Sequence, residues 1–449
     1  MLVRFVWQED TLAQAFLHEY LQAQLLELGD ILGEDGKSLF TGGFSPHAYS
    51  HSPNVGKSSL LLSMNRIKVW HLARVVNRHD FIDTIVRYLD RARFEVGVVT
   101  FQRESNIEPP RYEEAGIPHW VIPVRSERAY GAYVLAAWRL ARLLGQEGVQ
   151  ILHAHHYWDG VAAVLAKKLY PAIRLVLHRH YAEDILRLSP IKRKILLAME
   201  RWMYREAKRV IVPAPQVARV VQQLHGEMPK VEAIPLGFEF SAEKYQRPSE
   251  ERRRAVRSQY GASTEHFVLI NVASHWVQKG QHVLLRAFER VRKVIPQMRL
   301  WLVGEGPDTP MLKALAAELR LLEGGKEAPC QFLGWRRGLE VRDLMAAADL
   351  FVHPTFSESF SQVMVESLSL GLPFLVTSVP GPADYLRHGE TAWLVPREDV
   401  AALAEALLYL YQNPDLRLAI AQRGRAFVRE TFDYTEVNKK YEQLYASLV

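Results

Sequence analysis

This sequence of 449 residues has little cysteine, no long apolar run and little excess of charge of either sign. The single cysteine, Cys330, can form neither an internal disulfide nor a cysteine zinc cluster, which indicates a reducing compartment. No apolar run reaches the ~18 residues that a membrane helix needs. The net charge of +6 suits an anionic partner but is too small to indicate nucleic acid.

The composition is that of an ordinary soluble globular protein, with 48% hydrophobic and 24% charged residues. The chain is longer than one hydrophobic core usually holds, which favours two domains. Its first residues lack a long apolar core and reach acidic side chains at Glu9 and Asp10, so we expect no signal peptide. These features predict a cytoplasmic enzyme or binding protein.

Residues 1–63 differ in texture from the rest, and we expect them to be an N-terminal extension. They include the segment SPNVGKSSL (52–60), which is similar to a phosphate-binding loop. His51 stands where that motif needs its first glycine, and no strand pattern precedes it. The segment is therefore expected to be a flexible loop.

From residue 64 onward, short apolar runs alternate with helical patterns, which predicts parallel sheets covered on both faces. The alternation pauses in a charged, apolar-poor stretch and then resumes. The fold class expected is α/β, with two doubly wound Rossmann-like domains and a ligand site beyond the carboxyl ends of the strands. The predicted boundaries are 64–240 for the first domain, 241–262 for the linker, 263–425 for the second domain and 426–449 for a C-terminal helix that crosses back to the first.

The segment from His353 to Ser378, HPTFSESFSQVMVESLSLGLPFLVTS, carries the clearest pattern. A strand ends at His353, Ser361 is suited to cap a helix that starts at Gln362, and Gly371 ends that helix. The N–H groups of the first helical turn can bind a phosphate.

Two glutamates flank this predicted helix start. Glu358 lies in the loop before it, where a carboxylate can reach a sugar ring, and Glu366 lies just over one turn inside, where it can accept bonds from a ribose diol. Taken alone, Glu358 could equally be a loop charge and Glu366 a solvated helix position. The surrounding segment favours the functional interpretation.

The two glutamates with seven residues between them, followed by Gly-Leu-Pro and a strand, resemble the signature of glycosyltransferase family 4. The resemblance continues in order through the Lys-Gly segment 274–291, the Gly-x-Gly-Pro turn in 300–315 and the loop 377–396, which contains Gly381 and Asp384. It covers roughly residues 66 to 430. This resemblance implies a GT-B fold, with an acceptor-binding first domain, a nucleotide-sugar-binding second domain and transfer that retains the anomeric configuration.

The resemblance also assigns roles to residues. Glu358 would lie beside the transferred sugar, Glu366 would hold the nucleotide ribose, and Lys279 would neutralise the diphosphate. A fixed cation there makes physical sense, because the leaving diphosphate gains charge as the glycosidic bond breaks. Gly280 would allow close approach of the loop. The remaining donor-binding candidates are Ser361, Gln362, Val363, Gly334 and His275.

The sequence departs from the family pattern at two places. The arginine usual about five residues before the lysine is absent, because Ala273, Ser274 and His275 occupy that region. The Gly-Gly turn after the first strand is also absent. There the candidates for an acceptor or phosphate pocket are Arg74, Asn77 and Arg78, and a plain loop is an equally good interpretation.

Histidines gather at the ends of two predicted strands. By resemblance, His180 is the best candidate for the family histidine near the donor sugar, and His178 is the second. The His-x-His at His153 and His155 puts both rings on one side of a strand. With no cysteine nearby, satisfied structural histidines are favoured over a metal site, and the absence of Asp-x-Asp also argues against a metal-dependent transferase.

The function expected is a retaining, metal-independent, hexosyltransferase-like enzyme that acts on a glycan, lipid-linked or small-molecule acceptor. It would need no cofactor and would use a nucleotide-sugar, with UDP or GDP as the base most expected, as a co-substrate. The alternative is a non-catalytic nucleotide-sugar or glycan-binding protein on the same scaffold. The basic amphipathic stretch 191–209 suggests peripheral contact with the cytoplasmic membrane face, although an ordinary surface helix is favoured.

Overall fold

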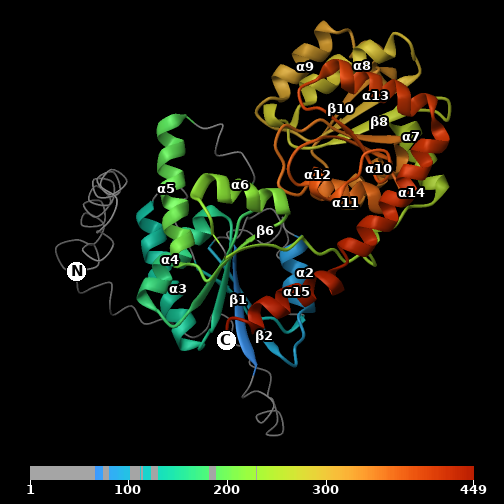
Figure 1. The fold of residues 1–449 in the computed structure, drawn as a ribbon. Helices are drawn as coiled ribbons and strands as arrows, with labels where there is room; N and C mark the ends of the chain where they lie inside the picture. Colours follow the sequence, from blue (N-terminus) through green and yellow to red (C-terminus); the bar gives the residue numbers. More distant parts are fainter. Residues whose placement is uncertain are drawn as a thin grey trace. The chain divides into compact units, whose positions relative to one another are not determined.

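The computed structural model describes residues 66–73, 80–101, 112, 115–122, 130–181, 189–228 and 230–449. These residues form two compact units (Figure 1). The first unit comprises residues up to Arg179, Arg187–Ile211 and Lys440–Val449. The second comprises His180–Leu186 and Val212–Lys439. Residues 1–63 and the candidates Arg74, Asn77 and Arg78 lie outside the described residues.

The first sheet has seven strands in the order β3-β2-β1-β4-β5-β6-β7, and the strands from β3 to β6 pair in parallel, as the alternation of apolar runs and helices predicted. Its β1 pairs on one side with β2 and on the other with β4, so the chain doubles back at β1. The elements are β1 (Ile67–Ala73), α2 (Asp80–Tyr88), β2 (Phe94–Thr100), β3 (His119–Val121), α3 (Tyr130–Gln146), β4 (Ile151–His155), α4 (Tyr157–Leu169), β5 (Arg174–His178), α5 (Pro190–Glu206), β6 (Arg209–Val212), α6 (Pro215–His225) and β7 (Val231–Ala233).

The second sheet has six strands in the order β10-β9-β8-β11-β12-β13, again parallel. The order reverses between β8 and β11, which places the carboxyl ends of these two strands at the switch point where ligands bind in such sheets. The strands are β8 (Phe267–Val272), β9 (Met298–Val303), β10 (Cys330–Gly334), β11 (Leu350–His353), β12 (Phe374–Thr377) and β13 (Trp393–Val395).

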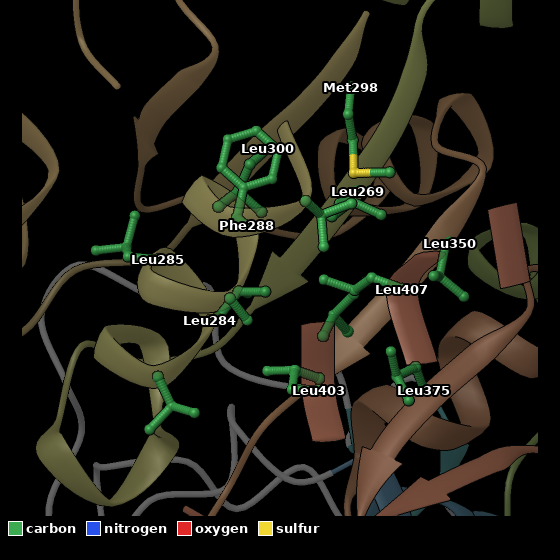
Figure 2. Packing of buried hydrophobic residues seen from close by; sticks show 14 of the residues in the cluster. Leu269, Leu284, Leu285, Phe288, Met298, Leu300, Leu350, Leu375, Leu403 and Leu407 are labelled. Carbon is green, nitrogen blue, oxygen red and sulfur yellow. The ribbon is translucent and has the colours of Figure 1, made fainter. Parts of the chain in front are cut away.

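Helices cover both faces of the second sheet (Figure 1). Helices α8, α9 and α13 cover one face, where leucines of the strands meet leucines and Phe288 of the helices in one core (Figure 2). Burial of each such side chain contributes about 1.5–3 kcal/mol, so this core fixes the strand ends that carry the site. The helices are α7 (Glu250–Gln259), α8 (Gln281–Arg292), α9 (Thr309–Glu318), α10 (Leu339–Ala347), α11 (Gln362–Ser369), α12 (Pro382–Tyr385), α13 (Val400–Gln412), α14 (Pro414–Thr431) and α15 (Tyr434–Ala446), with short 3-10 turns η6 (Glu243–Tyr245), η7 (Val277–Lys279) and η8 (Gly325–Glu327).

Helix α7 lies in the charged stretch 241–262, which sequence analysis treated as a linker. Arg257 on this helix is buried, and its guanidinium donates to the main-chain oxygens of Ala347 and Ser263 and pairs with Asp349. The charged residues of this stretch therefore do not mark a solvent-exposed linker throughout, because Arg257 is buried and binds main-chain carbonyl groups of neighbouring segments. In the described part of the chain, no helix combines the length and apolar content that crossing a bilayer requires.

Candidate active site

Glu358 follows β11, in the loop that connects this strand to α11. The strand lies between β8 and β12 in the second sheet, so the loop leaves from the carboxyl edge near the switch point. The end of β11 at His353 and the start of α11 at Gln362 agree with the sequence prediction. The fold therefore places Glu358 where a doubly wound sheet binds its ligand.

Lys279 reaches the same place from the other side of the switch point. It ends the turn η7 after β8, and Gly280 follows with a positive φ of 69°. A Cβ on Gly280 would lie 1.9 Å from the carbonyl oxygen of Pro354, so the two loops can touch only because this residue is glycine. The N–H of Phe356 also donates to the oxygen of Gln278 at 2.7 Å.

This contact between the loops creates a three-residue ionic cluster. The Lys279 ammonium donates to Oε2 of Glu358 at 2.8 Å, and Nε2 of His353 contacts the same oxygen at 3.2 Å. A carboxylate can only accept, so His353 carries its proton on Nε2. Sequence analysis missed His353 as a site residue. Its signal was a polar side chain at the last position of a buried strand.

The electrostatics of the cluster favour an ionised glutamate. Burial raises the pKa of Glu358, but the charge of Lys279 and the hydrogen bond from His353 outweigh it and lower the pKa to about 2. Burial lowers the pKa of His353, and its interactions with Glu358 offset this only in part. At neutral pH the cluster therefore holds one ammonium, one carboxylate and one neutral imidazole.

The start of α11 supplies main-chain donors beside this cluster. Gln362 and Val363 occupy its first turn, where N–H groups have no acceptor inside the helix. Ser361 does precede the helix, but the expectation that its side chain caps it was wrong. Its φ of 75° is left-handed rather than extended, and its buried Oγ finds no hydrogen-bond partner among the described residues. Glu366 lies in the second turn of the same helix and is half-buried.

His275 occupies the region where the family pattern has an arginine. Its Nδ1 lies 2.8 Å from the Thr309 hydroxyl, while its Nε2 is buried and has no hydrogen-bond partner in the described part of the protein. Burial lowers its pKa, so the ring is neutral. Gly306 packs so closely on His275 that a Cβ would lie 2.4 Å from its carbonyl oxygen. Gly334 ends β10 with a φ of 69°, and its carbonyl accepts from Gly304.

The two candidate histidines, His178 at the end of β5 and His180 just after it, fall in different units. The carbonyl oxygen of His180 accepts a hydrogen bond from the Ser359 hydroxyl at 2.6 Å, next to Glu358. His178 instead is buried in the first unit, where its ring stacks on His153 with centroids 5.5 Å apart. The structure thus brings the main chain of His180 to the candidate loop.

A second group of ionisable residues lies in the first unit. Strand register sets His71 beside His153, and the ring of His155 follows on the same face of the sheet. His71 Nδ1 and His155 Nε2 share a hydrogen bond of 3.0 Å, and His153 Nδ1 bonds the Tyr445 hydroxyl at 2.7 Å. We call these four side chains the histidine cluster.

The three imidazoles of the cluster offer ring nitrogens that all lie within 4.8 Å of one another, a spacing compatible with metal binding. The local electrostatics favour a neutral network instead. Burial and, to a smaller extent, the positive charge of Arg91 together lower the pKa of His71 to about 3. A nearby guanidinium disfavours a dication that three neutral ligands would leave uncompensated.

Comparison with known proteins agrees with this architecture. One family model, described as glycosyl transferases group 1, matches residues 266–413, and another, described as glycosyltransferase family 4, matches residues 80–241. Together they match more than half of the chain. The pair covers the second sheet with the candidate loop, and the first sheet from β2 onward, which includes β4 but not β1.

Curated relatives share part of their length with this chain. The lipopolysaccharide core biosynthesis glycosyltransferase LpsE of Rhizobium meliloti is 30% identical over 40% of this chain and half of its own length. The N-acetyl-alpha-D-glucosaminyl L-malate synthase of Bacillus anthracis is 23% identical over 70% of this chain and 80% of its own.

Solved structures with this fold include HepE of Anabaena in complex with UDP and glucose, at a TM-score of 0.71 and 21% identity over 85% of this chain and all of that one. WaaG, a glycosyltransferase of lipopolysaccharide biosynthesis, matches at a TM-score of 0.64 and 19% identity over 84% of this chain and 99% of that one. These likenesses confirm the GT-B fold. Glycosyltransferases of this kind typically need no cofactor. The two family models, together with these structural likenesses, show that the chain belongs to the group 1, family 4 glycosyltransferases of GT-B fold.

Proposed function

We propose that this protein transfers a sugar, with retention of configuration and without a metal ion, from a nucleotide-sugar to a glycan, lipid-linked or small-molecule acceptor. One observation carries the proposal. An ammonium and an ionised carboxylate, Lys279 and Glu358, meet 2.8 Å apart beside the free N–H groups of a helix start. Such a place suits a diphosphate whose charge grows as the glycosidic bond breaks.

The donor would bind across the carboxyl edge of the second sheet. Lys279 and the N–H groups of Gln362 and Val363 would hold the diphosphate, with the Ser361 hydroxyl as a further donor. Glu366 would accept hydrogen bonds from the ribose. Gly334 and His275, at the neighbouring strand ends, would border the nucleotide.

The sugar would lie at Glu358, whose Oε2 is already engaged by Lys279 and His353. The second oxygen of the carboxylate would be the one that faces the sugar. The acceptor would attack from the side that the diphosphate leaves, and the departing diphosphate would take its proton. His180, held through its carbonyl beside this loop, is the proposed second residue at the sugar.

A UDP-sugar is the donor proposed first, because the structure of HepE of Anabaena has been solved with UDP and with UDP-glucose. GDP is the second choice. We further propose the domain division 64–240 for the acceptor and 263–425 for the donor, with 426–449 returning to the first domain. In support of the last point, residues 440–449 belong to the first unit.

The proposal is tested by incubating the full-length protein with UDP-, GDP- and ADP-sugars and measuring the free nucleoside diphosphate. One donor should be turned over, and Glu358→Ala should reduce that turnover by about 10²–10³-fold, as loss of a group that stabilises the transition state does. Turnover that survives this substitution would contradict the assigned site.

A non-catalytic nucleotide-sugar or glycan-binding protein is the second candidate. It is favoured by the serine, Ser274, at the position of the family arginine, and by the pairing of Lys279 with Glu358, which already neutralises the ammonium. In that case every nucleotide-sugar tested would bind, as seen by an upward shift of the melting temperature, and none would be consumed.

Contact with an anionic membrane surface on the cytoplasmic side is a further part of the proposal. The first turns of α5 expose Ile191 (75% exposed) together with Lys192 and Lys194. An exposed apolar side chain between basic ones suits the interface of anionic lipid. Salt-sensitive co-sedimentation with phosphatidylserine vesicles is expected for the wild-type protein. The test variant carries three substitutions, Ile191→Ser, Lys192→Ser and Lys194→Ser. If this triple variant and the wild type pellet equally with the vesicles, the membrane contact is ruled out.

A further inference from the structure

The loop after β12 contains Gly381 and Asp384, a pair that the proposed chemistry does not use. Asp384 is 4% exposed through its side chain and lies in the short helix α12. Its Oδ2 accepts the main-chain N–H of Gln216 at 2.9 Å. Gln216 lies 168 residues away in sequence, in the first turn of α6 within the same unit.

Helix α6 has no cap of its own. The residue at its N-cap position is Ala214, whose methyl group cannot accept a hydrogen bond, and Pro215 has no N–H. The carboxylate of Asp384 therefore provides the cap from a distant segment, and its negative charge suits the positive end of the helix. A second bond strengthens this contact, because the hydroxyl of Tyr385 donates to the oxygen of Pro213 at 2.6 Å.

The same loop touches the candidate catalytic loop through Gly381. A Cβ on this glycine would lie 2.6 Å from the carbonyl carbon of Ser359 and 2.8 Å from the N of Phe360. Only glycine allows this approach, and its φ of 88° also favours glycine. Ser359 in turn donates to the oxygen of His180 at 2.6 Å. A continuous set of close contacts thus runs from α6 through Asp384 and Gly381 to the residue next to Glu358.

We propose that Asp384 is a positioning residue, which caps α6 and thereby fixes the contact of Gly381 with Ser359. That contact in turn sets Glu358 and the main chain of His180. It would touch neither donor nor acceptor. This inference rests on the proposed function, because its consequence is a slower transfer. Its structural part, the capping of α6 from α12, is independent of that function and can be measured without it.

The experiment compares Asp384→Ala with Asp384→Asn in the full-length protein. Asp384→Ala should lower kcat about tenfold or more, since small misplacements of a reacting group are costly, while the Kd for UDP changes less than about threefold. Amide hydrogen exchange at Gln216 should become faster in the same variant. The amide oxygen of Asp384→Asn can still accept the N–H, so this variant should recover most of both effects.

Asp399→Ala is the matched control, because Asp399 caps α13 through the N–H groups of Ala401 and Ala402. It should lower the melting temperature by loss of a cap, with kcat unchanged. If Asp384→Ala lowers kcat no more than this control does, the positioning role is overturned. Unchanged exchange at Gln216 in Asp384→Ala would overturn the capping contact itself. Inactivity of the wild type towards every donor would refute the proposed function, and the exchange measurement would still decide the contact.

Discussion

Two groups of buried ionisable side chains occupy equivalent places in the two units, near the carboxyl ends of central strands, and they differ in charge. The histidine cluster of the first unit consists of imidazoles and a tyrosine. Burial keeps its members neutral, and the pKa of His153, for example, lies well below its ordinary value. The cluster around Glu358 in the second unit is ionised, since Lys279 and His353 hold the pKa of the carboxyl near 2.

From this difference we expect the first group to serve the fold and the second, as proposed, to serve a ligand. A buried ion pair rarely stabilises a protein more than apolar residues of the same volume would, so charge at Glu358 is better explained by chemistry than by stability. In the neutral network, one hydrogen bond joins β1 to β4 and another joins β4 to α15, so the network ties those elements together. The three predictions that follow test this contrast.

Acid should separate the two groups and produce the largest effect. The folded-state pKa of His71 is lowered from 6.5 to about 3, so below pH 6.5 the unfolded chain binds more protons than the folded one. Stability is therefore lost as the pH falls from 6.5, by roughly 1.4 kcal/mol per pH unit for each such histidine. The pKa of Glu358 is lowered instead from 4.5 to about 2, so its contribution is complete above pH 4.5 and is lost only as the pH falls further towards 2.

Urea unfolding at pH 7, 6 and 5, combined with amide hydrogen exchange, checks this prediction. Amides of β1 and β4 should lose protection between pH 6.5 and 4.5, after correction for the intrinsic pH dependence of exchange. Amides of β8 and β11 serve as the internal reference and should keep theirs. Equal loss in both sheets would show that the histidine cluster is not the acid-sensitive element.

Tyr445→Phe should have the next largest effect, because it removes the hydroxyl that bonds His153 Nδ1 inside the cluster. A buried polar group left without its partner costs about 1–3 kcal/mol of unfolding free energy. The control is Tyr411→Phe. The Tyr411 hydroxyl accepts a hydrogen bond from Gln297 at a half-buried position of the second unit, so its loss should lower the unfolding free energy less, by about 1 kcal/mol at most. The free energies come from chemical denaturation at pH 7. Equal losses in the two variants would argue against a special role of the cluster.

Sequence patterns predicted the local parts of the second unit well. Strand β11 ends at His353 and the Glu358 loop ends at Gln362, both as predicted. These features depend on a few neighbouring residues, such as a β-rich apolar run followed by a polar turn. The short strand β13 (Trp393–Val395) was not predicted, because three residues are too few for a periodic signal.

Contacts between distant segments could not be predicted in the same way. Sequence analysis placed His153 and His155 on one side of a strand, but it did not include His71, which joins them only through the register of β1 with β4. The bond between His353 and Glu358 was missed for a related reason, since the loop after β11 must fold back to make it. The capping of α6 by Asp384 spans 168 residues, and no local pattern marks it.

Ser361→Ala should have the smallest effect on stability, and for that reason it is a sharp test of the second unit. Its buried Oγ has no hydrogen-bond partner among the described residues, so its removal should change the unfolding free energy by less than about 0.5 kcal/mol. If the diphosphate accepts a bond from this hydroxyl, the Kd for UDP should rise by about 2–12-fold, which corresponds to one ordinary hydrogen bond.

The opposite pattern is expected for Ser369→Ala at the end of the same helix. The Ser369 hydroxyl is buried and donates to the oxygen of Glu366 at 2.8 Å, so its loss should lower stability and leave the Kd for UDP unchanged. Isothermal titration with UDP and urea unfolding measure both quantities for both variants. If Ser361→Ala leaves UDP binding unchanged, the Ser361 hydroxyl is a packing feature, and the diphosphate would depend on Lys279 and the main chain of α11 alone.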